Sequence, residues 1–188
     1  MKIWKLAKPY LKKGIIKDFI LHTEGVVKAT EMILRKKRGD REILIPAAIL
    51  HDVGWAKVPK ELQQVNSRKK KNKKTIIKAH KLHIEYAPGI IYGILNKLEY
   101  GRKTINKIVA IVRDHKFRNP KNINKRILID ADTLGCVFSK QFYSDAKSYG
   151  NSPEENYAIR KKENKFYTKT AKEIFEREMK NRKTEISD

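Results

Sequence analysis

Apolar residues recur every three or four positions along most of this chain, and alternating strand-like patterns are scarce. Such spacing places the apolar side chains on one face of an α-helix. The clearest apolar stripes follow His22, precede His51, follow His83 and precede His115, and another surrounds an acidic pair near residue 130. The pattern predicts an all-α protein, a bundle in which several helices bury these stripes against one another.

The 188 residues suit one domain with a sizeable core, and no internal repeat or linker divides them. We therefore predict a single helical domain over residues 1–188, with its core at about 19–139. Residues 152–155 are Ser-Pro-Glu-Glu, which combines an N-cap, a proline at the first helical position and a capping box. They predict a C-terminal helical segment over about 152–180, formed by one helix, and the end of the chain from residue 183 is expected to fray.

The formal net charge is +23, from 44 Lys and Arg against 21 Asp and Glu. Such a charge attracts polyanions and anionic ligands. Because the excess is spread along the whole chain, it favours general surface composition over a dedicated nucleic-acid site, and it also suits a phosphate-bearing substrate. The densest basic run, residues 67–74, lacks apolar residues and is predicted to be a solvated loop, with contact to a polyanion or phosphate as the alternative.

The chain has one cysteine, Cys136, so an intrachain disulfide is excluded and a reducing compartment is favoured. No stretch approaches the ~20 apolar residues that cross a bilayer, and the first residues lack the apolar run of a signal peptide. These features predict a cytoplasmic protein that does not enter membranes.

Four of the five histidines form an ordered series with two aspartates: His22, the pair His51-Asp52, His83, His115 and Asp132. Imidazole and carboxylate groups together are ligands of divalent transition metals. Each of these residues lies in or beside a predicted helix, so the series predicts a metal site inside the bundle. Neighbours on a helix point about 100° apart, so His51 and Asp52 can serve one pair of ions only if Asp52 lies between them with one oxygen towards each.

Two further residues are alternative ligands. His80 lies three residues before His83, so both can share one face of a helix. Asp130 and Asp132 point about 200° apart on a helix, so only one of them should reach the metal, and the other would be a supporting or solvated carboxylate. The spacing leaves both choices open.

The order His, His-Asp, His, His, Asp resembles the signature of the HD-domain superfamily of metal-dependent phosphohydrolases. The resemblance covers roughly residues 19–139 and is closest at Leu-His-Asp-Val-Gly, residues 50–54, and at Ile-Asp-Ala-Asp-Thr-Leu, residues 129–134. It implies an all-α bundle with the metal site between its central helices.

The resemblance also settles the ligand alternatives. It implies that His83 rather than His80, and Asp132 rather than Asp130, binds the metal. Single-metal members need only the first histidine, the doublet and the last aspartate, so the presence of His83 and His115 favours two ions. The ions implied are divalent transition metals, Fe, Mn, Ni, Co or Zn, with Mg as a further option.

The activity implied is hydrolysis of a phosphate ester or anhydride, with a nucleotide as the favoured substrate. Asp52 and Asp132 are the implied catalytic carboxylates, and a metal-activated water would be the nucleophile. Two alternatives share the fold. One is a di-iron oxygenase on the same ligands, and the other is an HD protein that binds nucleic acid or a nucleotide without catalysis.

One position departs from the family pattern. Many members carry a lysine three residues after the aspartate of the doublet, where this chain has Trp55. Lys57, Arg113 and Lys116 are the candidates to replace that lysine in binding phosphate, whereas Trp55 would stack on a base or pack in the core. Gly54 is expected to let the chain turn where its helix ends.

Overall fold

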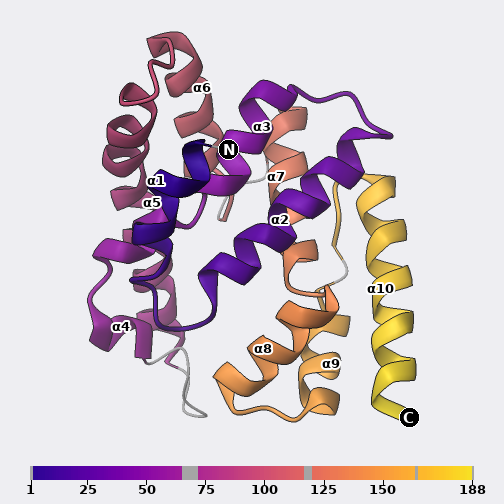
Figure 1. Cartoon of the computed structure of the whole chain (residues 1–188). Helices are drawn as coiled ribbons and strands as arrows, with labels where there is room; N and C mark the ends of the chain where they lie inside the picture. The colour runs from indigo at the N-terminus through magenta and orange to yellow at the C-terminus, as the bar shows by residue number, and fades with distance from the viewer. Residues whose placement is uncertain (1, 65–71, 117–119, 164, 188) are drawn as a thin grey trace.

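The structure, a computed structural model, describes residues 2–64, 72–116, 120–163 and 165–187. Within these ranges it is built from helices and contains no strand, as the apolar spacing predicted (Figure 1). In chain order the elements are α1 (Lys2–Leu11), α2 (Phe19–Leu34), α3 (Arg41–Leu50), the short 3₁₀ helix η1 (Val53–Lys57), α4 (Lys60–Gln64), α5 (Lys73–Asn96), α6 (Arg102–Arg113), α7 (Ile123–Gly135), α8 (Ser139–Tyr149), α9 (Pro153–Lys161) and α10 (Lys169–Ser187).

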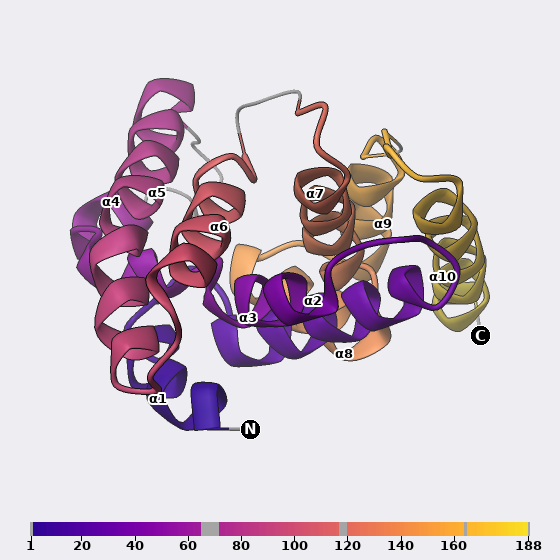
Figure 2. The same cartoon turned by 90° about the horizontal axis from the view of Figure 1, so that it is seen from above.

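The centre of the bundle is formed by α2, α3 and α7. The α2 helix packs along α7 and against α3, and α6 reaches both α3 and α7. Seen from above, these central helices lie between α5 and α6 on one side and α10 on the other (Figure 2). The α1 helix packs on η1 and α3, while α9 packs on α8 and α10. Each of the predicted stripes therefore faces a neighbouring helix.

Side-chain caps set where several helices begin. The carboxylates of Asp18 and Asp40 accept hydrogen bonds from backbone N–H groups in the first turns of α2 and α3. The predicted capping box of Ser152 and Glu155 is present at the start of α9. Of the predicted basic loop, residues 67–71 lie outside the described residues, and residues 73–74 already belong to α5.

The predicted C-terminal segment consists of two helices rather than one. The α9 helix ends at Lys161 and α10 begins at Lys169. Between them, the Asp130 carboxylate of α7 accepts hydrogen bonds from the backbone N–H groups of Tyr167 and Thr168 and from the Thr168 hydroxyl. This anchor fixes the chain in a non-helical path before α10. The α10 helix then continues to Ser187, where the sequence predicted a frayed end.

Two glycines allow backbones to approach closely. A Cβ on Gly54 would lie 1.8 Å from the backbone carbonyl oxygen of His83, so only glycine lets η1 rest against α5. Its backbone is not left-handed, so Gly54 serves this close approach rather than the expected turn. On α7, a Cβ on Gly135 would lie 2.6 Å from Val26 of α2.

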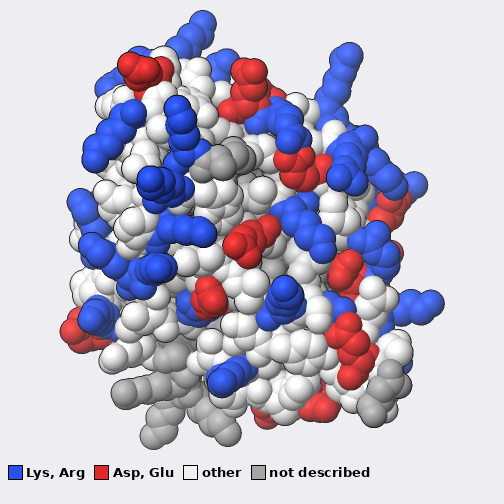
Figure 3. Space-filling model, in the orientation of Figure 1, with Lys and Arg blue, Asp and Glu red and all other residues white. Residues whose placement is uncertain are grey.

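Basic side chains are distributed over the whole face drawn in Figure 3, with acidic side chains between them. This distribution is what a generally basic composition produces, and it differs from a single basic stripe along one element. No helix in the described part of the chain is both long and apolar enough to cross a membrane.

Candidate metal centre

The six predicted ligands come from five parts of the bundle and meet in its interior. His22 lies in the first turn of α2, His51 and Asp52 join α3 to η1, and His83 lies on α5. His115 follows the end of α6, and Asp132 lies on α7. All six residues are buried, with relative exposures between 0 and 6%.

Asp52 occupies the centre of this cluster. Its Oδ2 atom lies 3.6 Å from Nε2 of His22 and 3.2 Å from Nε2 of His51. Its Oδ1 atom faces the other way, 3.6 Å from Nε2 of His83 and 4.0 Å from Nε2 of His115. Each carboxylate oxygen therefore faces its own pair of histidines, the arrangement in which one carboxylate can serve two ions.

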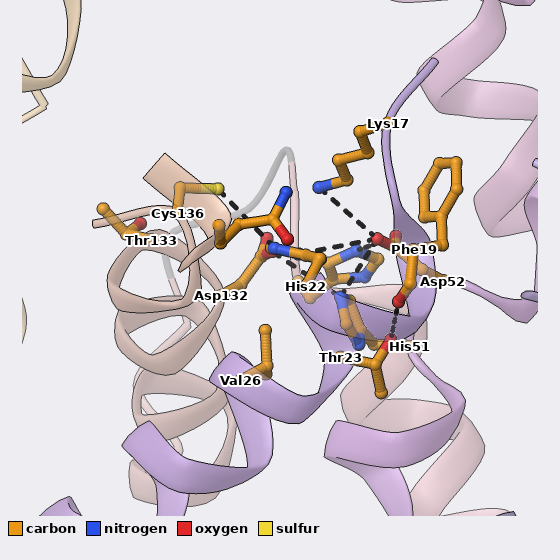
Figure 4. A network of polar contacts seen from close by, with 12 residues as sticks. Lys17, Phe19, His22, Thr23, Val26, His51, Asp52, Asp132, Thr133 and Cys136 are labelled. Carbon is orange, nitrogen blue, oxygen red and sulfur yellow. Dashed lines mark hydrogen bonds and ion pairs between the residues drawn. The ribbon is translucent and has the colours of Figure 1, made fainter. Parts of the chain in front are cut away.

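Asp132 joins the first of these two groups. Its Oδ1 atom lies 3.0 Å from Nε2 of His22 and 3.6 Å from Nε2 of His51 (Figure 4). The groups are thus His22, His51, Asp52 and Asp132 on one side, and Asp52, His83 and His115 on the other. In each histidine-containing triad around Asp52, the ligand atoms lie within 4.8 Å of one another.

The orientation of the rings fits a metal ion. Nδ1 of His51 lies 2.8 Å from the carbonyl oxygen of Ala48, and Nδ1 of His115 lies 2.5 Å from that of Val112. A carbonyl oxygen only accepts hydrogen bonds, so each Nδ1 carries a hydrogen and Nε2 is left to face the carboxylates. Nε2 of His51 is buried and forms no hydrogen bond within the described residues. The lone pair of such a nitrogen atom is available to bind a cation.

The charges of the cluster suit metal binding. Burial, and then Lys17, lowers the pKa of His22 to about 3, and burial, and then Lys116, lowers the pKa of His115 to about 4. Both rings are therefore neutral near pH 7, the form that binds metals. Burial would also lower the pKa of His51, but the carboxylates, Asp52 first, outweigh it and raise the pKa to about 9. Without an ion, a proton holds this ring between the carboxylates.

Comparison with known families now identifies the chain. A family model described as HD domain matches residues 19–135. The chain belongs to the HD-domain family. All six proposed ligands lie inside the matched stretch of this HD-domain protein. Family membership and the grouped His and Asp side chains support a metal-dependent hydrolase.

Two solved structures resemble the HD-domain protein over nearly its whole length. One is a predicted HD superfamily hydrolase from an uncultured Thermotogales bacterium, with 22% identity, a TM-score of 0.62, and coverage of 98% of this chain and 87% of that chain. The other is Bacillus subtilis YpgQ in complex with ADP, with 17% identity, a TM-score of 0.62, and coverage of 98% and 94%. At these identities the likeness shows the fold. None of the curated proteins compared matches the chain.

Trp55, at the position where many HD-domain proteins carry lysine, is buried against the ligands. Its ring stacks on His83, with centroids 4.7 Å apart and planes 9° apart. Its indole N–H donates a hydrogen bond of 3.2 Å to Oδ1 of Asp52. Trp55 therefore orients two of the proposed ligands of the HD-domain protein, while its edge also lines a cleft beside them.

The alternative ligands lie elsewhere. The oxygens of Asp130 accept hydrogen bonds from the segment before α10, on the far side of α7 from the histidines. His80 stands edge-on to Trp55, with ring centroids 5.3 Å apart, and lines the cleft. His80 belongs to neither of the His and Asp groups that could hold an ion among the described residues, whereas His83 belongs to one of them. Asp132 lies within 3.6 Å of both His22 and His51. The choice of His83 and Asp132 as ligands, which the family resemblance implied, stays a prediction.

A cleft of about 560 Å³ opens beside the ligands of the HD-domain protein. Asp52, Asp132 and Trp55 line one part of it, and residues of α8 and α9 line another, among them Tyr149 and Arg160. Of the basic residues suggested by the sequence, Lys116 lines the cleft and binds Oδ2 of Asp132 through its ammonium group. Lys57 and Arg113 are exposed and do not line it.

Lys17 is a cleft residue that was not among the sequence-based candidates. Lys17 lies in the cleft wall, with Nζ 3.9 Å from Oδ2 of Asp52 and 12% of its side chain exposed. In a chain with 44 Lys and Arg, no local pattern distinguishes it. The available signal was Asp18, a capping residue shortly before His22, which places Lys17 next to the helix that carries the first ligand.

Proposed function

We propose that this HD-domain protein is a metal-dependent phosphohydrolase acting on a phosphate ester or anhydride, with a nucleotide as the favoured substrate. The observation that carries the proposal is that two ligand groups sharing Asp52 adjoin a cleft that Lys17 and Lys116 also line. Metal ligands and ammonium groups in one cleft are suited to the charge of a phosphate group. The ADP complex of Bacillus subtilis YpgQ, a protein of the same fold, supports a nucleotide.

In this proposal each ligand residue belongs to one of two metal-binding groups, and Asp52 belongs to both. His22, His51, Asp52 and Asp132 would hold one ion, and Asp52, His83 and His115 would hold a second. A divalent transition metal held there would lower the pKa of a bound water and would offset negative charge on phosphate oxygens. Because both groups include Asp52, the orientation of this single side chain sets their relative position.

Asp132 is the second carboxylate at the cleft. Burial would raise its pKa, but Lys116, followed by His22 and His51, holds the pKa well below its usual value, so Asp132 is ionised near pH 7. Lys116 binds one of its oxygens and His22 faces the other at 3.0 Å. An ionised carboxylate so held accepts a hydrogen bond from water in the cleft and orients it, which is the catalytic role that we assign to Asp132.

Elemental analysis tests the proposal on untagged wild-type protein beside Asp52→Asn, a substitution that preserves shape but removes the shared charge. We expect about two equivalents of a transition metal in the wild type and less than half of one in the variant, by the ligand count above. Asp114→Ala is the matched control, because this acid adjoins His115 but pairs with Lys125. Phosphate-ester and nucleotide hydrolysis should follow the metal content in all three proteins.

Other outcomes separate the alternatives. Close to one equivalent in the wild type would remove His83 and His115 from the ligand set. No metal after reconstitution with Mn, Fe, Ni or Co would refute the catalytic proposal and favour a binding protein. Oxygen-dependent turnover with a mixed-valence iron signal would identify the di-iron oxygenase instead.

A further inference from the structure

Lys17 is placed where a phosphate group would meet the metal centre. It lies between the end of α1 and the start of α2. Its Nζ atom is 3.9 Å from Oδ2 of Asp52 and 5.3 Å from the centroid of the Phe19 ring. Figure 4 shows the ammonium group pointing towards Asp52 from the side opposite His51. With most of its side chain buried, Lys17 brings a positive charge to the cleft wall directly beside the shared ligand.

The hydrogen-bonding capacity of this ammonium is not used within the described part of the chain. A separation of 3.9 Å exceeds the length of a hydrogen bond, and an ammonium group has three N–H donors. Burying such a group costs free energy unless the donors find acceptors. Lys116 differs in this respect, because its ammonium is bonded to Asp132. Lys17 therefore has donors available for the oxygens of a molecule in the cleft.

The backbone around Lys17 is held in place from both sides. The side-chain carbonyl of Gln63 accepts a hydrogen bond of 3.0 Å from the backbone N–H of Ile15. The amide group of Gln63 donates to the backbone carbonyls of Trp55 at 3.1 Å and Val58 at 2.9 Å. This buried glutamine thus ties the segment before Lys17 to η1, the element that follows Asp52. On the other side, Asp18 caps α2.

The remaining cations of the cleft are already engaged or exposed. Arg160 donates to Asp145 at 2.8 Å and to Glu163 at 2.9 Å. Lys162 and Lys165 line the cleft but are exposed. Among the described cations of the cleft, Lys17 is therefore the one that is largely buried and whose ammonium group forms no hydrogen bond.

We propose that Lys17 contacts the phosphate oxygens of the substrate and supplies the phosphate-binding cation for which the sequence offered Lys57, Arg113 and Lys116. The proposal rests on the proposed function, and it assigns the reacting phosphate to the part of the cleft that Lys17 and Asp52 both line. Its ligand class is a phosphate monoester or anhydride with oxygens free to accept from an ammonium group.

Binding of inorganic phosphate to the metal-loaded protein tests this assignment. Lys17→Met keeps the length of the stem but removes the charge, Lys17→Arg keeps the charge, and Lys13→Met removes an exposed lysine from the same segment. Calorimetry should give a phosphate Kd at least ~10-fold higher in Lys17→Met, since a charge-assisted hydrogen bond is lost. Lys17→Arg should recover most of the affinity, and Lys13→Met should match the wild type. Elemental analysis should show equal metal content in all four proteins.

Three results would overturn the assignment. They are an unchanged phosphate Kd in Lys17→Met, a wild type that binds no phosphate, and a loss of affinity that only follows a loss of metal, which would mean that Lys17 acts through Asp52. The proposed function can fail separately. If the wild type binds phosphate through Lys17 but hydrolyses no phosphate ester or anhydride, the assignment stands and the phosphohydrolase proposal is wrong.

Discussion

Substituting Gly54 by alanine should destabilise the protein far more than one added methyl group usually does. The new Cβ would lie 1.8 Å from the His83 carbonyl oxygen, whereas real Cβ contacts essentially never fall below 3.0 Å, so η1 and α5 would have to separate by roughly 1.2 Å. The obstructing groups, the carbonyl of His83 and the amide nitrogen of Ala87, belong to the backbone, which cannot rotate away. The cost should reach the upper end for an overpacked core, about 3 kcal/mol, which lowers Tm by roughly 6–12 °C in a chain of this size.

Gly93→Ala provides the matched control. Gly93 lies on α5 itself, and a Cβ there would meet nothing within 4 Å. Because alanine favours the helix over glycine, this variant should gain about 0.5–1 kcal/mol. Differential scanning calorimetry should thus give shifts of opposite sign, and Gly54→Ala should also lose metal because His83 moves away from Asp52. A Tm of Gly54→Ala within about 2 °C of the wild type would refute the packing argument.

Further predictions concern the other face of α7 and the pH dependence of stability. Asp130→Ala should lower the free energy of unfolding by about 2–3 kcal/mol, because Thr168 and its neighbour lose their acceptor, yet leave the metal content unchanged; a loss of metal would contradict its anchoring role. Urea titration of the metal-free protein should give the highest stability near pH 6.5. As the pH falls below 6.5, His22 and His115 become protonated in the unfolded state, whereas in the folded state they stay neutral down to about pH 3 and 4. Stability therefore falls with decreasing pH. Above pH 6.5, the stabilisation that comes from protonated His51 is lost as the pH rises through about 9. A stability that stays constant between pH 5 and 9 would contradict both the lowered and the raised histidine pKa values.

Much of the fold was predictable from the sequence because the deciding signals are local. The apolar spacing defines the buried face of each helix, and the capping box at Ser152 marks where α9 begins. The break before α10 could not be seen in this way, because the carboxylate that holds it, Asp130, lies 38 residues before Thr168. Without knowledge of that contact, a continuous helix was the natural prediction for this stretch.

The candidate site, like the fold, could be predicted from the sequence only in part. The ordered histidines and aspartates pointed to a metal centre, and the role of Asp52 between two groups followed from helix geometry. Lys17 was not predicted, because the contact that places it joins Ile15 to Gln63, 48 positions away. Trp55 was left with two interpretations, stacking on a base or packing in the core, since its contacts with His83 and Asp52 depend on how closely η1 approaches α5.

Much of the cleft wall lies outside the stretch of the chain that carries the proposed metal ligands. Every proposed ligand lies within residues 19–135, the part that matches the family, whereas Lys17, Tyr149 and Arg160 lie outside it. Mutation can therefore reshape this part of the cleft without touching the proposed metal ligands. A chimaera that keeps residues 19–135 and takes its flanking segments from another family member should retain its metal while exchanging its substrate preference. Diversity of substrates on one unchanged reaction centre is a natural outcome of this layout.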